Sequence, residues 1–177
     1  VANASTELSI RGLLIDCMRL DRSPYYSINI HGGKRDRADN LIAAIDLLPP
    51  EARSRLTLEN CERAYGVIEL AEVSRETGVP VVLDSHHHTF RDNGLELSDA
   101  ISLATATWRG VKPLQHLSNS EPGCPDRLLR AHSQYVHSVP RQQLVLLTEE
   151  LVDIEMEFKM KNLAIERAIE DGLVPAL

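Results

Sequence analysis

Cysteine is scarce in this sequence, and its spacing indicates neither a disulfide framework nor a zinc ribbon. Cys17, Cys61 and Cys124 are odd in number, lie far apart and form no Cys-x-x-Cys pair. Small disulfide-rich secreted domains and cysteine-based zinc modules need paired cysteines. We therefore expect a reducing compartment, which means a cytoplasmic protein.

Long hydrophobic runs are absent as well. No stretch approaches the roughly 18 apolar residues that a transmembrane helix needs. No basic segment followed by an apolar one opens the chain either. We expect a soluble protein with no membrane partner. The first residue is valine rather than methionine, which indicates a fragment or a processed chain.

Basic residues are fewer than acidic residues in this chain. The chain has 26 acidic and 19 basic residues, a formal net charge of -7. This balance argues against a nucleic-acid-binding protein that uses a broad basic surface. It does not exclude one whose phosphate contacts are made by bound cations, because divalent ions in a carboxylate cluster reverse the local potential. Charge alone therefore leaves nucleic-acid binding open.

The composition is otherwise ordinary for one globular domain. The chain has 177 residues, of which 43% are hydrophobic and 25% charged, and we expect a single domain over residues 1–177. Five short segments have the character of strands, and each is followed by a helix or a long loop. The predicted strands are 25–30, 55–58, 79–83, 111–117 and 152–158. The predicted helices are 5–20, 38–48, 65–78, 98–108, 140–151 and 159–171.

Two neighbouring strands deliver a carboxylate at their C-terminal ends. Glu59 follows the strand in LTLEN, and Asp84 follows the strand in VPVVLD. The helix predicted between them ends at Gly78, which suits the left-handed position after a helix. A β-α-β unit places its strands parallel in one sheet, so both carboxylates emerge from the same edge. Two carboxylates that close repel each other unless a cation or a shared proton lies between them.

A structural role for these carboxylates is the alternative to a metal site. A single acidic residue after a strand is more often a helix N-cap or a solvated loop charge. Three consecutive histidines, residues 86–88, follow Asp84, however, and His87 lies three residues beyond that carboxylate. Imidazole is a common metal ligand. The joint pattern favours a divalent-metal site.

The remaining strand ends extend this pattern. Four of the five strands end in His31, Glu59, Asp84 or His116, and the fifth offers Glu157. Site residues at several C-terminal strand ends are typical of a (β/α) barrel. A closed barrel has eight strands in about 250 residues, whereas this chain has room for five. We therefore expect an α/β fold, a partial (β/α)8 TIM barrel of about five βα units that lacks its N-terminal units.

Five motifs carry a resemblance to a known family. In order they are LTLEN, GVPVVLDSHHH, KPLQHLS, RAHSQYV and DIEMEFKMKNLAI. They resemble the C-terminal two-thirds of the UV-damage endonuclease family, whose barrel is similar to those of endonuclease IV and xylose isomerase. The resemblance implies a DNA repair endonuclease that uses divalent metals, usually manganese, to hydrolyse the phosphodiester bond 5′ to a UV photoproduct. Its partner would be damaged double-stranded DNA, and in a bacterium it would associate with the nucleoid.

The resemblance also implies a set of metal ligands. They are His31 for the first metal, Asp84, His116 and Glu157 for the second, His87 and His132 for the third, and Glu59 bridging two metals as the central catalytic carboxylate. Carboxylates suit manganese or magnesium, whereas imidazoles suit manganese or zinc. A mixed set therefore fits Mn2+, with Zn2+ and Mg2+ as alternatives.

Other polar residues of these motifs are less specific. Lys159 is a catalytic candidate that could orient Glu157, although a basic residue in the first turn of a helix is also ordinary surface chemistry. His86, His88 and His137 are expected to be neighbours of the site rather than ligands.

Three departures from the family pattern keep alternatives open. Cys61 stands where members usually have an acid, and Leu114 stands where many have a lysine. The N-terminal part, which in the family supplies a further histidine ligand and the residues that probe damaged bases, is not present. The alternatives are a sugar isomerase or epimerase on the same barrel, and a catalytically impaired remnant. The open sheet would expose an apolar barrel interior and an unpaired edge at strand 25–30, which favours a homo-oligomer.

Overall fold

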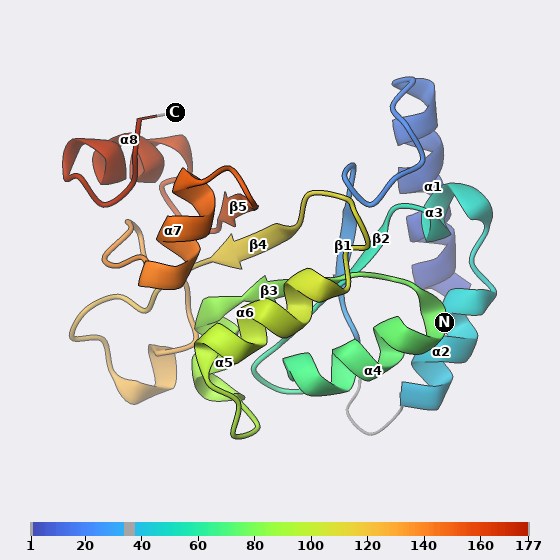
Figure 1. Cartoon of the computed structure of the whole chain (residues 1–177), viewed down its shortest axis with the longest axis horizontal. Coiled ribbons are helices and arrows are strands. Elements are labelled where there is room, and N and C mark those ends of the chain that lie inside the picture. Colours follow the sequence, from blue (N-terminus) through green and yellow to red (C-terminus); the bar gives the residue numbers. More distant parts are fainter. Residues whose placement is uncertain (1, 34–37, 177) are drawn as a thin grey trace.

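The strand ends of this chain meet along one side of a single parallel sheet. We describe residues 2–33 and 38–176 of a computed structural model (Figure 1). The sheet has five strands in the order β1-β2-β3-β4-β5, and every neighbouring pair is parallel. The strands are β1 Ile28–His31, β2 Leu56–Glu59, β3 Val81–Asp84, β4 Leu114–Leu117 and β5 Asp153–Met156. A sheet whose spatial order equals its chain order is the arrangement of a barrel segment, so the predicted α/β partial barrel is confirmed.

Helices connect and flank these strands. They are α1 Ala2–Cys17, α2 Ala38–Asp46, α3 Pro50–Arg53, α4 Val67–Thr77, α5 Ser85–Phe90, α6 Leu97–Ala106, the 3-10 helix η1 Asp126–Leu128, α7 Arg141–Thr148 and α8 Asn162–Glu170. Figure 1 shows α4 and α6, which pack on each other and on β3, side by side along the sheet. Helices α1 and α3 lie at one end of the sheet, and α7 and α8 lie at the other (Figure 1). None of the helices described combines the length and hydropathy needed to cross a bilayer.

The predicted helices are all present, but their limits differ and three short ones were not predicted. The first helix begins at Ala2 and ends at Cys17, and the last begins at Asn162 rather than at residue 159. The unpredicted helices are α3, α5 and η1. The helix predicted over residues 38–48 ends at Asp46, and Pro50 begins α3, since proline at the first helical position loses no hydrogen bond.

Alternation along the strands separates an apolar face from a largely polar one. Leu56, Leu58 and Leu83 are fully buried in a cluster with the apolar residues of α4 and α6. The intervening positions, which project to the opposite face, include Asn29 and Thr57. The expected apolar barrel interior is therefore wrong. The inner face of this sheet carries polar and ionisable groups because the site lies there.

Candidate metal centre

Two groups of potential metal ligands share one residue. The cross-strand partners His31 and Glu59, and likewise Asp84 and His116, lie in register at the carboxyl end of the sheet. The ligand atoms within each group lie within 4.8 Å of one another. The first group is His31, Glu59 and His87, and the second is Glu59, Asp84, His116 and Glu157. Glu59 therefore occupies the position between two candidate metal sites.

A chain of hydrogen bonds fixes the Glu59 carboxylate. Asn29 Nδ2 donates to Glu59 Oε2 at 2.6 Å, and Thr57 Oγ1 donates to Asn29 Oδ1 at 2.9 Å. Because the Thr57 proton is used in that bond, the Ser27 hydroxyl donates to Thr57 Oγ1 at 2.6 Å. Glu59 Oε1 lies 3.3 Å from His31 Nε2 and 3.2 Å from His87 Nδ1. One oxygen is thus held by the sheet, and the other faces the imidazoles.

Asp84 serves as a helix cap and as a candidate ligand at once. The backbone N–H of His87 donates to Asp84 Oδ1 at 2.7 Å, which caps α5. Asp84 Oδ2 is buried and has no hydrogen-bond partner among the described residues. The two interpretations that competed at the sequence level are therefore compatible, because they use different oxygens.

Asn60 is a site residue that the sequence analysis did not identify. Its Nδ2 donates to the Asp84 carbonyl at 3.0 Å, and its Oδ1 accepts from the Asp84 N–H at 2.8 Å. Its own carbonyl lies 3.0 Å from His87 Nδ1. The side chain is buried, so this pairing positions β3 relative to β2. Its place directly after Glu59 in LTLEN was the one available signal.

His116 lies at the centre of the second group. Its Nδ1 is 3.4 Å from Glu59 Oε2 and 3.6 Å from Glu157 Oε1, and its side chain is buried. Gln143 of α7 donates from Nε2 to the His116 carbonyl at 3.1 Å and to Gln115 Oε1 at 3.0 Å. These buried amides anchor β4 to α7. The site residue is therefore held through its backbone as well as its ring.

Charge coupling within the cluster shifts several pKa values. Burial alone would raise the pKa of Glu59, but the facing imidazoles of His116, His31 and His87 outweigh it and hold that pKa well below its usual range. Burial opposes protonation of His87 and His116, yet their carboxylate neighbours raise the pKa to about 9 for His87 and about 10 for His116. Burial raises the pKa of Glu157. Opposite charges in close contact favour the ionised forms.

Buried atoms without hydrogen-bond partners in the two groups fit bound cations. Glu59 Oε1, Asp84 Oδ2 and His116 Nδ1 are buried and have no hydrogen-bond partner within the described ranges. Most buried polar atoms in proteins do have one, so three exceptions on neighbouring residues require an explanation. Glu59 Oε1 faces His31 and His87 of the first group, whereas Asp84 and His116 belong to the second. Divalent ions at the two sites would satisfy these atoms, since carboxylate oxygens and imidazole nitrogens are their ordinary ligands.

The predicted ligand His132 lies close to the groups without joining either. The His132 ring is 6.0 Å from the His87 ring, and its Nδ1 is 3.9 Å from Glu157 Oε2. His87 belongs to a group with His31 and Glu59, and its sharing of a third metal with His132 stays a prediction. His132 is adjacent but belongs to neither group.

Lys159 lies in the turn before α8, not in its first helical turn as predicted. Its side chain is exposed, and its backbone N–H donates to the Ser133 carbonyl at 3.1 Å. In the described part of the chain, no ion pair joins its ammonium group to Glu157. The helix starts later because Lys161 adopts a positive φ of 54° immediately before it.

The histidines expected to be neighbours have other partners. His88 Nε2 donates to the Leu95 carbonyl at 2.8 Å, and the His86 ring packs edge-on against Phe90 at 5.1 Å. His137 Nε2 lies 3.5 Å from Glu121 Oε1. None of these three histidines belongs to either ligand group.

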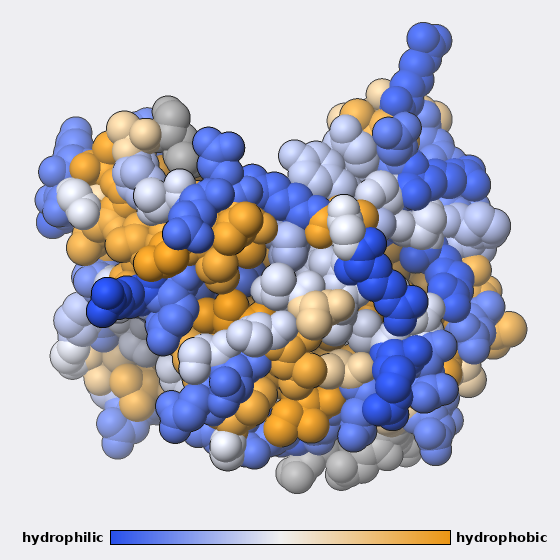
Figure 2. Space-filling view, in the orientation of Figure 1, coloured by the Kyte–Doolittle hydropathy of each residue, from blue (hydrophilic) through white to orange (hydrophobic). Residues whose placement is uncertain are grey.

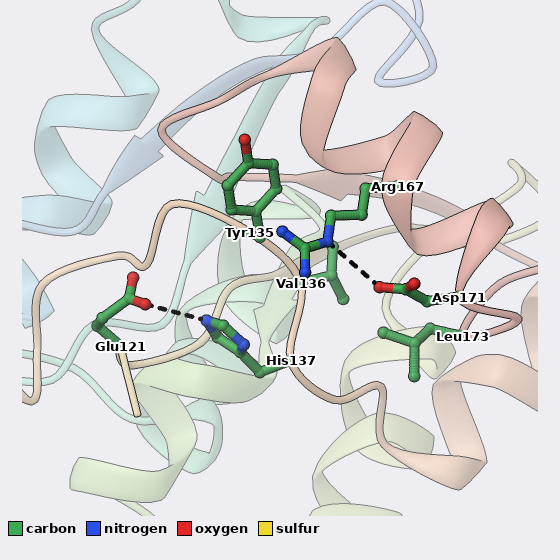
Figure 3. A pocket seen from close by; sticks show the side chains of 7 residues that line it. All are labelled: Glu121, Tyr135, Val136, His137, Arg167, Asp171 and Leu173. Atoms are coloured by element: carbon green, nitrogen blue, oxygen red, sulfur yellow. Dashed lines mark hydrogen bonds and ion pairs between the residues drawn. The ribbon is translucent and has the colours of Figure 1, made fainter. Parts of the chain in front are cut away.

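A separate cavity of about 470 Å³ lies between the β4–α7 loop and α8 (Figure 3). Its ionisable groups already have partners. Figure 3 shows His137 facing Glu121 and Arg167 facing Asp171. Arg167 Nε lies 3.4 Å from Asp171 Oδ2, and the Arg167 guanidinium lies 4.8 Å from the centre of the Tyr135 ring. The predicted site residues do not line this cavity. The candidate metal ligands therefore lie at the strand ends and not here.

Comparisons with known proteins identify relatives of this chain. The family described as UV-endonuclease UvdE matches residues 1–173. A UV DNA damage endonuclease of Nostoc sp. is 37% identical over 157 residues, covering 85% of this chain and 46% of that protein. A UV DNA damage endonuclease of Deinococcus radiodurans is 37% identical over 139 residues, covering 75% of this chain and 45% of that protein.

A solved structure, described as the crystal structure of SacUVDE, matches with a TM-score of 0.76 and 27% identity. The match covers 96% of this chain and 59% of that one. The chain spans about half the length of the curated relatives it matches.

Proposed function

The chain belongs to the UV-endonuclease UvdE family, and from this premise we propose that it carries the metal centre of a DNA repair endonuclease. The reaction is hydrolysis of the phosphodiester bond 5′ to a UV photoproduct in double-stranded DNA. The observation that supports it best is the sharing of Glu59 between two ligand groups. Such a shared carboxylate suits a two-metal centre, in which two ions stabilise the attacking and leaving oxygens. The names of the relatives favour this reaction over the isomerase alternative.

The protein's own residues prepare the centre. The Ser27–Thr57–Asn29 chain orients Glu59, and Asn60 fixes the backbone of Asp84. When bound, divalent ions supply the positive charge that neutralises phosphate and acidifies water for attack. We propose manganese as the native metal because the donor set mixes carboxylates with imidazoles, with zinc and magnesium as the alternatives to test.

The proposed partner is damaged duplex DNA, and the proposed location is the cytoplasm, at the nucleoid in a bacterium. A net charge of -7 opposes DNA binding by the protein surface alone. Cations bound at Glu59 and its neighbours reverse the local sign of the potential. DNA binding is therefore expected to depend on the metal.

An incision assay tests the proposed function. An end-labelled duplex with one UV photoproduct is incubated with the chain and Mn2+, Mg2+ or Zn2+, beside an undamaged duplex and a panel of ketoses. We expect metal-dependent incision 5′ to the lesion that is lost in Glu59→Gln and kept in Glu72→Gln, whose carboxylate is exposed on α4. Incision no greater than that of Glu59→Gln, or conversion of a ketose, contradicts the proposal.

A further inference from the structure

The second nitrogen of the His116 ring has a carboxylate neighbour that the ligand groups do not use. Nδ1 faces the second group, at 3.4 Å from Glu59 Oε2 and 3.6 Å from Glu157 Oε1. Nε2, on the other side of the ring, lies 3.5 Å from Glu155 Oε2. Glu155 belongs to neither ligand group.

The sheet itself produces this placement. His116 of β4 and Glu155 of β5 are cross-strand partners in a parallel pair. Partners in register project to the same face, so the backbone fixes their proximity. Glu157 follows two residues later and approaches the same ring from its Nδ1 side. Two carboxylates, one on β5 and one just after it, therefore flank the two nitrogens of one imidazole.

Ring chemistry gives the second carboxylate a role. A neutral imidazole has one N–H, so a ring that offers the Nδ1 lone pair to a metal carries its proton on Nε2. His116 Nε2 is buried and has no partner at hydrogen-bond geometry among the described residues. A buried donor without an acceptor is costly. Metal-binding histidines usually donate this second N–H to a carboxylate or a carbonyl, which fixes the tautomer and the ring orientation.

We propose that Glu155 is a positioning residue that accepts the Nε2–H of His116 and holds Nδ1 toward the second ligand group. The inference rests on the proposed metal centre and deepens it. The Glu155 side chain is 63% exposed, so packing does not prevent the small rotation that closes 3.5 Å to a hydrogen bond. Asp153, two residues earlier on the same face, is paired with Lys112 at 2.7 Å instead. Glu155 is therefore the carboxylate of this strand that reaches Nε2.

Metal titration of three variants tests the inference. Glu155→Ala removes the acceptor, Glu155→Gln keeps an acceptor oxygen without the charge, and Asp153→Asn is the matched control on the same strand. Affinity for Mn2+ is measured by calorimetry, and the Co2+ visible spectrum reports the ligand geometry. In Zn2+-loaded protein, 15N NMR of His116 reports which ring nitrogen carries the proton.

We expect Glu155→Ala to weaken metal binding about 10- to 100-fold, to change the Co2+ spectrum and to lose the fixed Nε2–H tautomer. Glu155→Gln should recover most of the affinity, because its amide oxygen accepts the same proton, and Asp153→Asn should match the parent. Parent-like affinity and spectra in Glu155→Ala overturn the inference. Equal losses of metal affinity in Glu155→Gln and Asp153→Asn also overturn the inference, because they indicate an effect of long-range charge alone. A parent chain that binds no divalent ion refutes the metal centre itself, which is a distinct result.

Discussion

The two oxygens of Glu59 have different surroundings, and this difference defines the role of the residue. Oε2 accepts from Asn29, whereas Oε1 lies among imidazole nitrogens without a hydrogen bond in the described part of the chain. A buried carboxylate is costly unless nearby charges or donors compensate it. His31, His87 and His116 provide that compensation in the absence of metal. The carboxylate therefore stays ionised and available to cations.

Glu59→Gln tests the bridging position directly. The substitution keeps the volume but removes one negative charge from between the two ligand groups, so affinity for Mn2+ should fall by at least the roughly 10- to 100-fold seen for outer-shell changes. Metal analysis and calorimetric titration measure the loss. Glu72→Gln, at an exposed position of α4, is the control and should bind as the parent does. Unchanged metal stoichiometry in Glu59→Gln would rule out bridging.

The raised pKa values of His87 and His116 predict proton release on metal binding. Burial opposes their protonation, but Glu59 contributes to raising the pKa of each, to about 9 for His87 and about 10 for His116. Both rings are therefore protonated at pH 7 in metal-free protein. Since a metal takes only a deprotonated nitrogen, binding should release about two protons at pH 7. Calorimetry in buffers of different ionisation enthalpy counts them, and a value near zero would contradict the expectation.

The same shifts set the pH dependence of metal-free stability. The folded pKa values lie above the ordinary value of 6.5, so protonation of the two rings stabilises the folded state. That contribution is fully present below about pH 6.5 and is lost as the pH rises through about 9 to 10. Chemical unfolding of metal-free protein across this range should show decreasing stability. Metal affinity should rise over the same interval.

At the scale of elements, Asp84 links strand β3 to helix α5. Asparagine caps helices about as well as aspartate, whereas alanine costs about 1 kcal/mol of stability. Asp84→Asn should therefore keep α5 and the metal-free melting temperature while weakening metal binding. Asp84→Ala should lower the metal-free melting temperature and also weaken metal binding. Thermal unfolding and Mn2+ titration of the two variants separate the cap from the ligand. Equal destabilisation of the metal-free Asp84→Asn and Asp84→Ala proteins would show that Oδ1 does not act as a cap.

The contact between α1 and α3 depends on a glycine. A Cβ at Gly12 would lie 2.6 Å from the Glu51 carbonyl oxygen, a backbone atom that has little freedom to move. Alanine gains about 1 kcal/mol of helix propensity, but overpacking costs about 1 to 3 kcal/mol. The contact is with backbone atoms, so steric strain should dominate, and Gly12→Ala is expected to lower the unfolding free energy by up to about 2 kcal/mol. Denaturant titration measures this, with exposed Glu7→Ala as the control.

The approximate strand ends were predictable from the sequence because an apolar run precedes each candidate ligand. Apolar runs marked the strands, and parallel β-α-β connections brought Glu59 and Asp84 to one edge. Asn60 and Glu155 were not predicted, because their roles depend on pairing between strands that no single segment encodes. Helix α5 was missed because six residues give little periodicity, and the capping bond to Asp84 defines its start.

At the scale of the whole molecule, both ends of the sheet present apolar side chains. Figure 2 shows apolar residues gathered over the end that holds α7 and α8, where Val145 and Leu163 are exposed. At the other end, α1 packs on α3 and β1, and Leu8 lies in the core. The outward side of this end exposes Ile10, Leu13, Leu14 and Met18, each at more than 50%. Apolar residues on two sides of a helix indicate that both sides pack against other protein surfaces.

These exposed residues predict concentration-dependent association. Strand β1 is the first strand of the sheet order, and among the described residues no strand pairs with its outer edge. Helix α1 packs on β1, so a second copy could cover both. We expect the parent chain to form dimers or larger species as its concentration rises from the low micromolar range. Leu14→Glu combined with Met18→Glu should shift it toward monomer by placing charge on the apolar stripe. Arg11→Glu, an exposed change on the same helix with the same total change in charge, should leave association intact. Sedimentation velocity compares the three, and a parent chain that stays monomeric throughout would show that this surface does not bind a second copy.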